Sequence, residues 1–304
     1  CICGGRNDLV RGNETADVMM KPVIQIIECP RDAMQGWTAF IPTQKKIEYI
    51  NSLLKVGFHT IDFGSFVSPK AVPQMADTKE VIEGLDVVEG SAELLAIVAN
   101  TRGAEEAVGW EKITYLGFPF SISPTFQQRN ANSSIQESLV RVDEIQNLCV
   151  KHNKRLVLYL SMAFGNPYGD EYSENVLLHW ASEMVNRDIA IISLADTIGV
   201  ATADQIATAF SLLIPAYTNV QFGVHLHSTA ENREQKVNAA YDAGCKRFDG
   251  ALKGIGGCPF ADDVLVGNLD TEWLLNFMDE KGERLSIDNE ALKNSSQLAE
   301  RIFV

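Results

Sequence analysis

Residues 189–227 read "IAIISLADTIGVATADQIATAFSLLIPAYTNVQFGVHLH", and this stretch holds one complete repeat of the pattern that decides the fold. It begins with a short apolar run rich in isoleucine and continues through a segment with helical spacing at 202–217. It ends in a second apolar run that carries two histidines. A strand, a helix and a second strand in this order predict two parallel strands joined by a crossover helix.

The same alternation extends along the chain in both directions from this repeat. Candidate strands lie at 23–28, 60–64, 93–99, 112–118, 155–162, 189–195, 220–226 and 247–252, and segments with helical spacing lie at 42–57, 133–152, 173–187, 202–217 and 232–244. Eight strand–helix units between residues 23 and 282 are what a closed barrel requires. The first strand runs into "CPRDAMQG" rather than a glycine-rich phosphate turn, which argues against a doubly wound sheet. The sequence therefore predicts the α/β class and a (β/α)8 TIM barrel.

The domain organisation is predicted from the absence of linkers. No run of proline, glycine, serine or like charges divides residues 23–282, so we expect a single catalytic domain over 23–304. Its C-terminal part, from about residue 283, is a polar helical tail expected to pack on the outside of the barrel. Residues 1–22 form an N-terminal tail that we expect to be partly disordered.

Composition excludes several classes of partner. The chain has 26 Lys plus Arg against 40 Asp plus Glu, and its net charge of −14 opposes binding to nucleic acid. No apolar run is long enough to span a membrane, and residues 1–22 lack the basic segment followed by an apolar segment that is typical of a signal peptide. The six cysteines contain no CxxC pair, so we expect reduced thiols and a cytoplasmic location. Whether the chain forms a homodimer is left open.

His225 and His227 stand two residues apart on a predicted strand, so they lie on one face and could share a ligand. A polar strand facing a wet cleft is the alternative. In a TIM barrel the reactive groups come from the C-terminal ends of the strands. Charged and metal-binding residue types fall at those positions in this chain: Arg31, Asp32, Asp62, Asp196, His225, His227, Cys258 and Asn268.

Each of the other residues also has a purely structural interpretation. Asp32 could cap a turn, while Asp62, Asp196 and Asn268 could cap helices. Cys258 could be a small buried apolar residue, but its "GGCP" loop favours an exposed and reactive thiol. One carboxylate, two imidazoles and an amide oxygen would leave two positions of an octahedron open, which favours Mg²⁺ or Mn²⁺. Zn²⁺ or Co²⁺ would also bind two histidines in vitro.

Several longer strings resemble one family. They are "RDAMQ" (31–35), "SFVSPKAVPQMAD" (65–77), "NANSSIQES" (130–138), "LADTIGV" (194–200), "VHLHST" (224–229), "GIGGCPFA" (254–261) and "GNL" (267–269). In this order, over about residues 22–282, they resemble the 3-hydroxy-3-methylglutaryl-CoA (HMG-CoA) lyases. The resemblance implies a divalent cation held by the residues matching Asp32, His225, His227 and Asn268. The substrate hydroxyl and a carboxylate oxygen would fill the open positions.

The resemblance also implies the reaction. The family carries out a retro-Claisen cleavage of an acyl-CoA substrate to acetyl-CoA and acetoacetate. Arg31 would stabilise charge on the thioester oxygen, and Cys258 would deliver a proton to the enolate carbon. His225 and Asp196 are both candidates for moving the hydroxyl proton. Asp62 is also expected at the catalytic centre.

Matching segments supply the expected contacts to substrate and CoA. These residues are Gln35, Ser65, Asn130, Asn132 and Ser134. The chain also departs from the family pattern, with Asp62 in place of the usual Glu and Ser228 in place of the usual Asp. Ala33 and Ala195 replace common glycines, and Asn166 stands where a cysteine is common. The resemblance thus defines the type of reaction more firmly than the substrate.

Two other functions remain alternatives. A sibling of the same barrel group would be an aldolase acting on a 4-hydroxy-2-oxo acid, or a Claisen-type condensing enzyme, and the "GGCP" string argues against both. From a different class, the chain could be a non-catalytic barrel that binds an acyl-CoA, inactivated by Asp62 and Ser228. Metal content after purification would separate this binding protein from the enzymes.

Overall fold

The strands of this computed structural model, which describes residues 23–257 and 266–303, close into a single barrel. Each strand pairs in parallel with the next along the chain, and the last pairs with the first. The strands are β1 (Gln25–Glu28), β2 (Thr60–Phe66), β3 (Glu93–Val98), β4 (Ile113–Ser121), β5 (Arg155–Ser161), β6 (Ile191–Asp196), β7 (Gln221–Leu226) and β8 (Arg247–Gly250). Each of the predicted strands overlaps one of these, and the predicted (β/α)8 barrel is confirmed.

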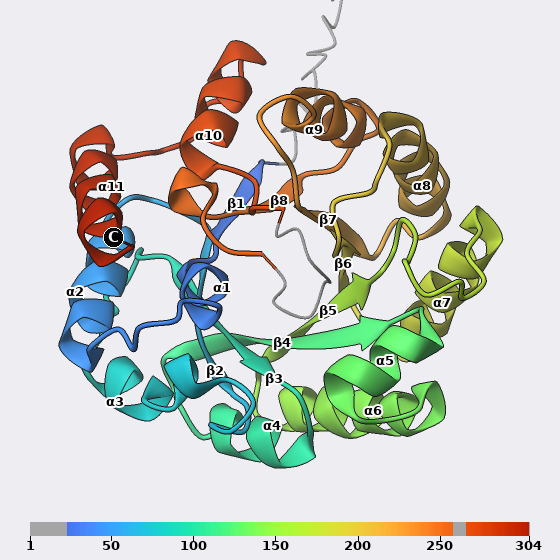
Figure 1. The fold of residues 1–304 in the computed structure, drawn as a ribbon, viewed down its shortest axis with the longest axis horizontal. Helices are drawn as coiled ribbons and strands as arrows, with labels where there is room; N and C mark the ends of the chain where they lie inside the picture. Colours follow the sequence, from blue (N-terminus) through green and yellow to red (C-terminus); the bar gives the residue numbers. More distant parts are fainter. Residues whose placement is uncertain (1–22, 258–265, 304) are drawn as a thin grey trace, which may run out of the picture.

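Helices surround the barrel as a ring (Figure 1). They are α1 (Pro30–Gln35), α2 (Thr43–Leu53), α3 (Thr78–Glu83), α4 (Thr101–Val108), α5 (Pro124–Ala131), α6 (Ile135–Lys151), α7 (Glu174–Val185), α8 (Ala203–Ala216), α9 (Arg233–Asp242), α10 (Thr271–Glu280) and α11 (Asn289–Ile302), with short 3-10 turns η1 (Pro73–Met75) and η2 (Leu252–Gly254). Ser134 and Thr202 cap α6 and α8 through reciprocal bonds with Glu137 and Gln205. Among the helices of the described residues, none has both the length and the apolar character to cross a membrane.

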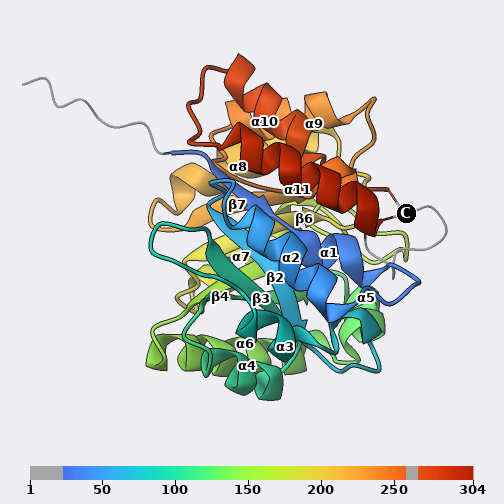
Figure 2. The ribbon, with the colours of Figure 1, turned by 90° about the vertical axis from the view of Figure 1, so that its left-hand side faces the viewer.

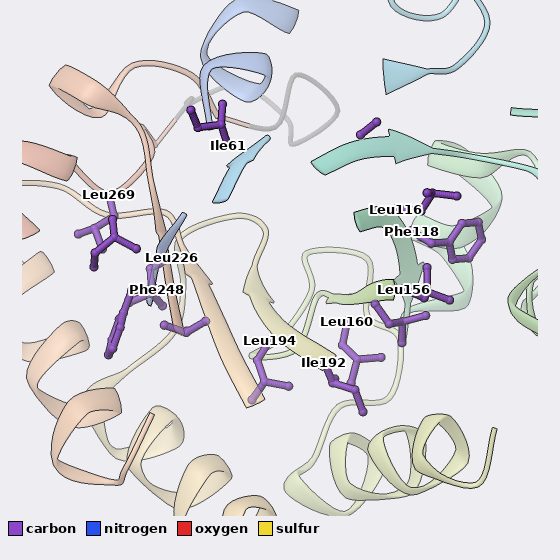
Figure 3. Packing of buried hydrophobic residues seen from close by; sticks show 14 of the residues in the cluster. Ile61, Leu116, Phe118, Leu156, Leu160, Ile192, Leu194, Leu226, Phe248 and Leu269 are labelled. Carbon is purple, nitrogen blue, oxygen red and sulfur yellow. The ribbon is translucent and has the colours of Figure 1, made fainter. Parts of the chain in front are cut away.

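Alternation along the strands separates two apolar layers. On β5, Leu156, Leu158 and Leu160 belong to the large cluster between barrel and helices, whereas Val157 and Tyr159 belong to a smaller cluster inside the barrel. Figure 3 shows residues of the outer cluster, with Leu160 of β5 beside Ile192 of β6. Burying one such leucine contributes about 1.5–3 kcal/mol. The helices are therefore held by every second residue of a strand, which leaves the alternate residues free to line the interior.

The C-terminal helix α11 packs along α2 on the outside of the barrel (Figure 2). Ser295 of α11 donates to Ser52 of α2 over 2.9 Å. Beyond the helix, the ring of Phe303 meets Trp37 and Tyr49 edge-on, with centroid distances of 5.4 and 6.1 Å. The end of the described chain is thereby tied to the segment that follows α1.

Glu28 ends β1 with its side chain fully buried on the side of η2 and α10. Its carboxyl oxygens accept bonds from the Leu252 amide (2.9 Å) and the Thr271 hydroxyl (2.6 Å). Burial raises the pKa of Glu28 to about 8, and these two bonds oppose the rise only in part. We expect Glu28 to be protonated at neutral pH in the folded protein.

Replacing Glu28 with glutamine is therefore expected to make the free energy of unfolding less dependent on pH. Between an unfolded pKa of about 4.5 and a folded pKa of about 8, the folded protein keeps a proton that the unfolded chain releases. The stability of the wild type then falls as pH rises, by at most about 1.4 kcal/mol per pH unit. Glutamine can still accept from Leu252 and donate to Thr271. Urea unfolding at several pH values in this window measures the slopes, and equal slopes would contradict the prediction.

Candidate active site

A cavity of about 210 Å³ opens at the carboxyl ends of the strands. It has an apolar wall that includes Val72, Ile97 and Phe126. The structure brings these of the predicted residues to its lining: Arg31, Asp32, Gln35, Asp62, Ser65, Asn130, His225 and His227. Residues from α1, β2, α5 and the end of β7 therefore meet at the rim formed by the carboxyl ends of the strands, where TIM-barrel active sites lie.

The short helix α1 carries Arg31 and Asp32 into this cavity immediately after β1. Nε of Arg31 donates to both oxygens of Asp62 (3.2 and 3.0 Å), and Nη2 donates to Asp62 Oδ2 (2.5 Å). Nη1 donates to Asp32 Oδ1 and to Gln35 Oε1, each over 2.8 Å. Gln35 in turn donates to Asp32 over 2.7 Å. One guanidinium thus bonds to the carboxylates of both Asp32 and Asp62, and these bonds, rather than helix capping, engage the two side chains.

The two carboxylates have different proton affinities. Burial raises the pKa of Asp32, but the charge of Arg31 and the two histidines outweigh it and lower the pKa to about 2. Burial dominates for Asp62 and raises its pKa to about 6 despite Arg31. For Arg31, burial lowers the pKa, but Asp62 and Asp32 outweigh this effect and raise it. Asp32 is therefore a permanent anion, while Asp62 can exchange a proton near neutral pH.

Both histidines are oriented through Nδ1. His227 Nδ1 donates to the Thr197 carbonyl over 2.9 Å, and His225 Nδ1 lies 3.2 Å from Asp249 Oδ2. Nε2 of His227 is buried and has no partner among the described residues. Asp32, His225 and His227 each present a possible ligand atom within 4.8 Å of the others. Two imidazoles with Nδ1 engaged leave Nε2 free as a ligand, which is the usual arrangement at metal sites.

The histidine pKa values move in opposite directions. Burial lowers the pKa of His225, but the bond to Asp249 and its charge outweigh this and raise it overall. Burial lowers the pKa of His227, and the neighbouring His225 lowers it further. His227 is therefore held neutral, the form in which an imidazole binds a cation.

Asn268 completes the donor set. It forms an isolated bridge with His227, and its Nδ2 donates to Asp32 Oδ2 (2.8 Å) and to the Ile255 carbonyl (2.9 Å). Its Oδ1 is used in neither bond and is available as a ligand. Asn268 does not cap α10, because Asp270 does. A carboxylate, an amide oxygen and two imidazoles fit a divalent cation such as Mg²⁺ or Mn²⁺.

A glycine segment approaches these residues closely. Gly256 has φ of +105°, and a Cβ there would lie 2.6 Å from Nδ2 of Asn268 and 2.9 Å from the carbonyl oxygen of Asp32. Only glycine combines this backbone conformation with so little space. Cys258, the thiol expected on this segment, lies outside the described residues.

Three predicted residues are not brought to the cavity. Asp196 ends β6, but its carboxylate bonds to Lys236 Nζ (2.7 Å) and accepts from the Ala201 amide (3.0 Å) in the layer between barrel and helices. Asn132 is exposed, with φ of 46° at the end of α5, and Ser134 is the exposed cap of α6. The structure gives all three positions a local structural explanation.

Sequence reasoning missed other polar residues at the site. Asp249 lies on β8 directly opposite His225 in the strand register and is almost completely buried. Tyr159 lines the cavity, and its buried hydroxyl, like that of Ser65, has no partner in the described part of the chain. The sequence showed only a charged residue inside the predicted strand 247–252, and its pairing with His225 is given by the strand register alone. Tyr159 carried no such signal, since an aromatic residue on a strand is usually core.

The fold and the donor set are those of a (β/α)8 barrel enzyme with a divalent-cation site at the ends of its strands. More narrowly, the chain belongs to the HMGL-like family, whose model matches residues 24–299.

Curated relatives and solved structures agree with this family. Hydroxymethylglutaryl-CoA lyase YngG of Bacillus subtilis is 31% identical over 89% of this chain and 90% of its own length. The cytoplasmic 3-hydroxy-3-methylglutaryl-CoA lyase of Rattus norvegicus is 31% identical over 87% of this chain and 77% of its own. A solved structure of an HMG-CoA lyase from A. baumannii, in complex with coenzyme A and 3-methylmalate, has a TM-score of 0.84 and 32% identity, covering 92% of this chain and 91% of that one.

Proposed function

We propose that this chain is a carbon–carbon lyase that cleaves 3-hydroxy-3-methylglutaryl-CoA, or a close 3-hydroxy-3-carboxymethyl analogue, to acetyl-CoA and acetoacetate. The convergence of Asp32, His225, His227 and Asn268 beside Arg31, within a chain of the HMGL-like family, carries this proposal. The names of the curated relatives support the substrate. The coenzyme A in the A. baumannii complex supports an acyl-CoA ligand.

These four residues would hold the cation, which we propose to be Mg²⁺ or Mn²⁺, with Zn²⁺ or Co²⁺ accepted in vitro. When bound, the cation supplies Lewis acidity that makes the substrate hydroxyl easier to deprotonate. Asp32 contributes the single negative charge of the set, because its pKa of about 2 keeps it ionised. The bonds of Nδ1 to Thr197 and Asp249 orient the two imidazoles.

Asp62 is our candidate for accepting the hydroxyl proton. It faces the cavity, lies outside the ligand set and has a pKa of about 6. Asp196 is engaged with Lys236, and His225 is assigned to the cation, so the two earlier candidates are not retained for this step. As Asp62 takes the proton, the carbon–carbon bond breaks and its electron pair moves into the thioester enolate.

Arg31 is positioned to stabilise the enolate charge. Its guanidinium lines the cavity between the two carboxylates and stays protonated throughout. We propose that it faces the thioester oxygen, where charge develops as the bond breaks. The enolate carbon then takes a proton, and the Cys258 thiol is our candidate donor.

Contacts to the substrate follow from the lining of the cavity. The Ser65 hydroxyl, buried and without a partner among the described residues, is our candidate for binding the substrate carboxylate. Asn130 lines the same cavity and is our candidate for contacting the acyl-CoA. Gln35 supports Arg31 and Asp32. Asn132 and Ser134 lie on the exposed turn beyond Asn130, where only the distal part of CoA could reach them.

The value of kcat/KM is expected to fall as pH drops through about 6, since protonated Asp62 cannot accept the substrate proton. Asp62→Asn should lower the rate and abolish this acid limb, whereas Asp62→Glu should keep a limb with a shifted midpoint. The profiles are measured at saturating Mn²⁺, with bound metal quantified at each pH, because protonation of a histidine ligand would also release the cation. An unchanged acid limb in the residual activity of Asp62→Asn would exclude Asp62 as the acceptor.

The test of the whole proposal is release of acetyl-CoA and acetoacetate from 3-hydroxy-3-methylglutaryl-CoA by purified protein with Mg²⁺ or Mn²⁺. Cleavage should occur with the cation, stop with EDTA and return when the cation is restored. Protein that binds Mn²⁺ but cleaves nothing would contradict the named substrate and direct the assay to other 3-hydroxyacyl-CoA thioesters. Acyl-CoA binding without metal binding or turnover would support the non-catalytic barrel instead.

We further propose that the chain acts in the cytoplasm. Its buried cysteines Cys29, Cys149 and Cys245 are free thiols, consistent with a reducing compartment. The rat relative above is named as cytoplasmic, whereas another in Mus musculus is named as mitochondrial. Fractionation of the source cells, followed by immunodetection, distinguishes the two locations.

A further inference from the structure

Cys29 lies beside the pair that orients His225. It is 1% exposed and directly follows β1, and the one hydrogen bond of its Sγ to a described residue is a long contact of 3.8 Å to the Ile27 carbonyl. Cys29, His225 and Asp249 each present a possible ligand atom within 4.8 Å of the others. The proposed function assigns no catalytic or binding role to the Cys29 thiol.

Asp249 supplies an independent indication of a ligand. Its Oδ2 lies 3.2 Å from His225 Nδ1, while its Oδ1 is buried and has no partner among the described residues. A buried carboxylate oxygen without a partner is unfavourable, and a bound cation is one way to satisfy it. The separation of 3.2 Å also suits two ligands of one tetrahedral ion, which stand roughly 3.3 Å apart when each bond is about 2.0–2.1 Å.

We propose that Cys29, His225 and Asp249 form a second metal site, selective for thiophilic divalent cations such as Zn²⁺ or Cd²⁺. A thiolate, an imidazole and a carboxylate are ligands that favour these ions, whereas Mg²⁺ and Mn²⁺ favour oxygen-rich sets. This site uses Nδ1 of His225. The site with Asp32 and His227 uses Nε2 of the same ring.

The two sites compete for His225. When a thiophilic cation binds, the sulfur–metal bond forms, the Cys29 thiol proton passes to solvent and the histidine proton moves from Nδ1 to Nε2. Nε2 then carries hydrogen and cannot bind a cation in the neutral ring. A thiophilic cation therefore displaces Mn²⁺ rather than adding to it. The competition rests on the proposed function, because it requires His225 to be a ligand of the first site. The second site, formed by Cys29, His225 and Asp249, does not depend on the proposed function.

The test is a Cd²⁺ titration followed by the ultraviolet charge-transfer band of a cadmium–thiolate bond, which ligation by nitrogen and oxygen alone does not produce. The titration uses a variant with the substitutions Cys1→Ser, Cys3→Ser and Cys258→Ser, so that these thiols do not contribute to the band. We expect a band that saturates at one Cd²⁺ per chain. Cys29→Ser in this background should abolish the band, and Cys149→Ser, which removes an equally buried thiol on α6, should keep it.

Two further measurements use the same band. Asp249→Asn should weaken Cd²⁺ binding about 10-fold or more, and saturating Mn²⁺ should lower the apparent Cd²⁺ affinity. Circular dichroism establishes that each variant is folded. A band that survives Cys29→Ser, or no band in the folded parent, would overturn the site, and indifference to Mn²⁺ would overturn the competition. None of these readouts needs substrate, so failure of the lyase assay leaves them unaffected.

Discussion

Replacing Asp32 with asparagine is expected to weaken Mn²⁺ binding by more than about 100-fold, beyond the 10- to 100-fold loss typical for a residue that only supports a ligand. Asp32 is the only carboxylate of the proposed set, and its pKa of about 2 keeps it charged at every pH used in an assay. Asparagine has nearly the same shape but no charge. Isothermal titration with Mn²⁺ measures the affinity, and cleavage at a fixed low Mn²⁺ concentration should fall in parallel.

A matched control is Asp196→Asn, which changes a buried carboxylate on β6 that does not line the cavity. Breaking its ion pair with Lys236 should destabilise the fold by about 3–5 kcal/mol. The protein that remains folded should bind Mn²⁺ as well as the wild type. If Asp196→Asn lost Mn²⁺ affinity and Asp32→Asn kept it, the assignment of the ligands would be wrong.

Arg31→Lys is expected to lower kcat by about 10²–10³-fold, which is the usual cost of removing a donor that faces developing negative charge. The guanidinium bonds to Asp62 through Nε and Nη2 and to Asp32 through Nη1 at the same time. A lysine ammonium keeps the positive charge but cannot span both carboxylates in this planar arrangement. Lysine is preferred to alanine because it does not leave two buried carboxylates without a cation.

Separate readouts distinguish catalysis from support of the metal site. If Arg31 acts on the thioester oxygen, kcat should fall while KM and the affinity for Mn²⁺ change far less. Gln35→Ala is the matched control, because Gln35 also contacts Asp32 from α1 but is assigned no charge to stabilise. A loss of Mn²⁺ affinity equal to the loss of kcat in Arg31→Lys would show that Arg31 only positions Asp32.

The strands and several helices were predictable because their signals are local. Most strands are short apolar runs, and helices such as α6 and α8 are capped by Ser134 and Thr202, whose side chains accept bonds from free amides of the first turn. At α9 the spacing predicted the helix, but Asn232 precedes it without capping it through its side chain. Closure of the barrel was predictable from the number of strand–helix units. Eight parallel strands form a closed barrel when the last strand pairs with the first, which leaves no free edge.

The site was only partly predictable, because sequence position reports which rim a residue reaches but not which side of the strand it faces. Asp196 and His225 both lie near the ends of strands, yet Asp196 points to Lys236 in the helix layer and His225 points into the cavity. Asp249 became visible only when the register placed β8 beside β7. The full burial of Glu28, which raises its pKa, was not predictable from any local pattern.

The sequence by itself determined the order of strands and helices, the (β/α)8 class and the strings that resemble one family, because these depend on periodicity and residue type along the chain. Only the tertiary structure decided which groups share a site. Side-chain atoms of Asp32 and Asn268 lie 2.8 Å apart although the residues are far apart in sequence, and Arg31 of α1 bonds to Asp62 of β2. Charge, burial and ligand geometry act through space, so the chemistry of this barrel arises where distant segments meet.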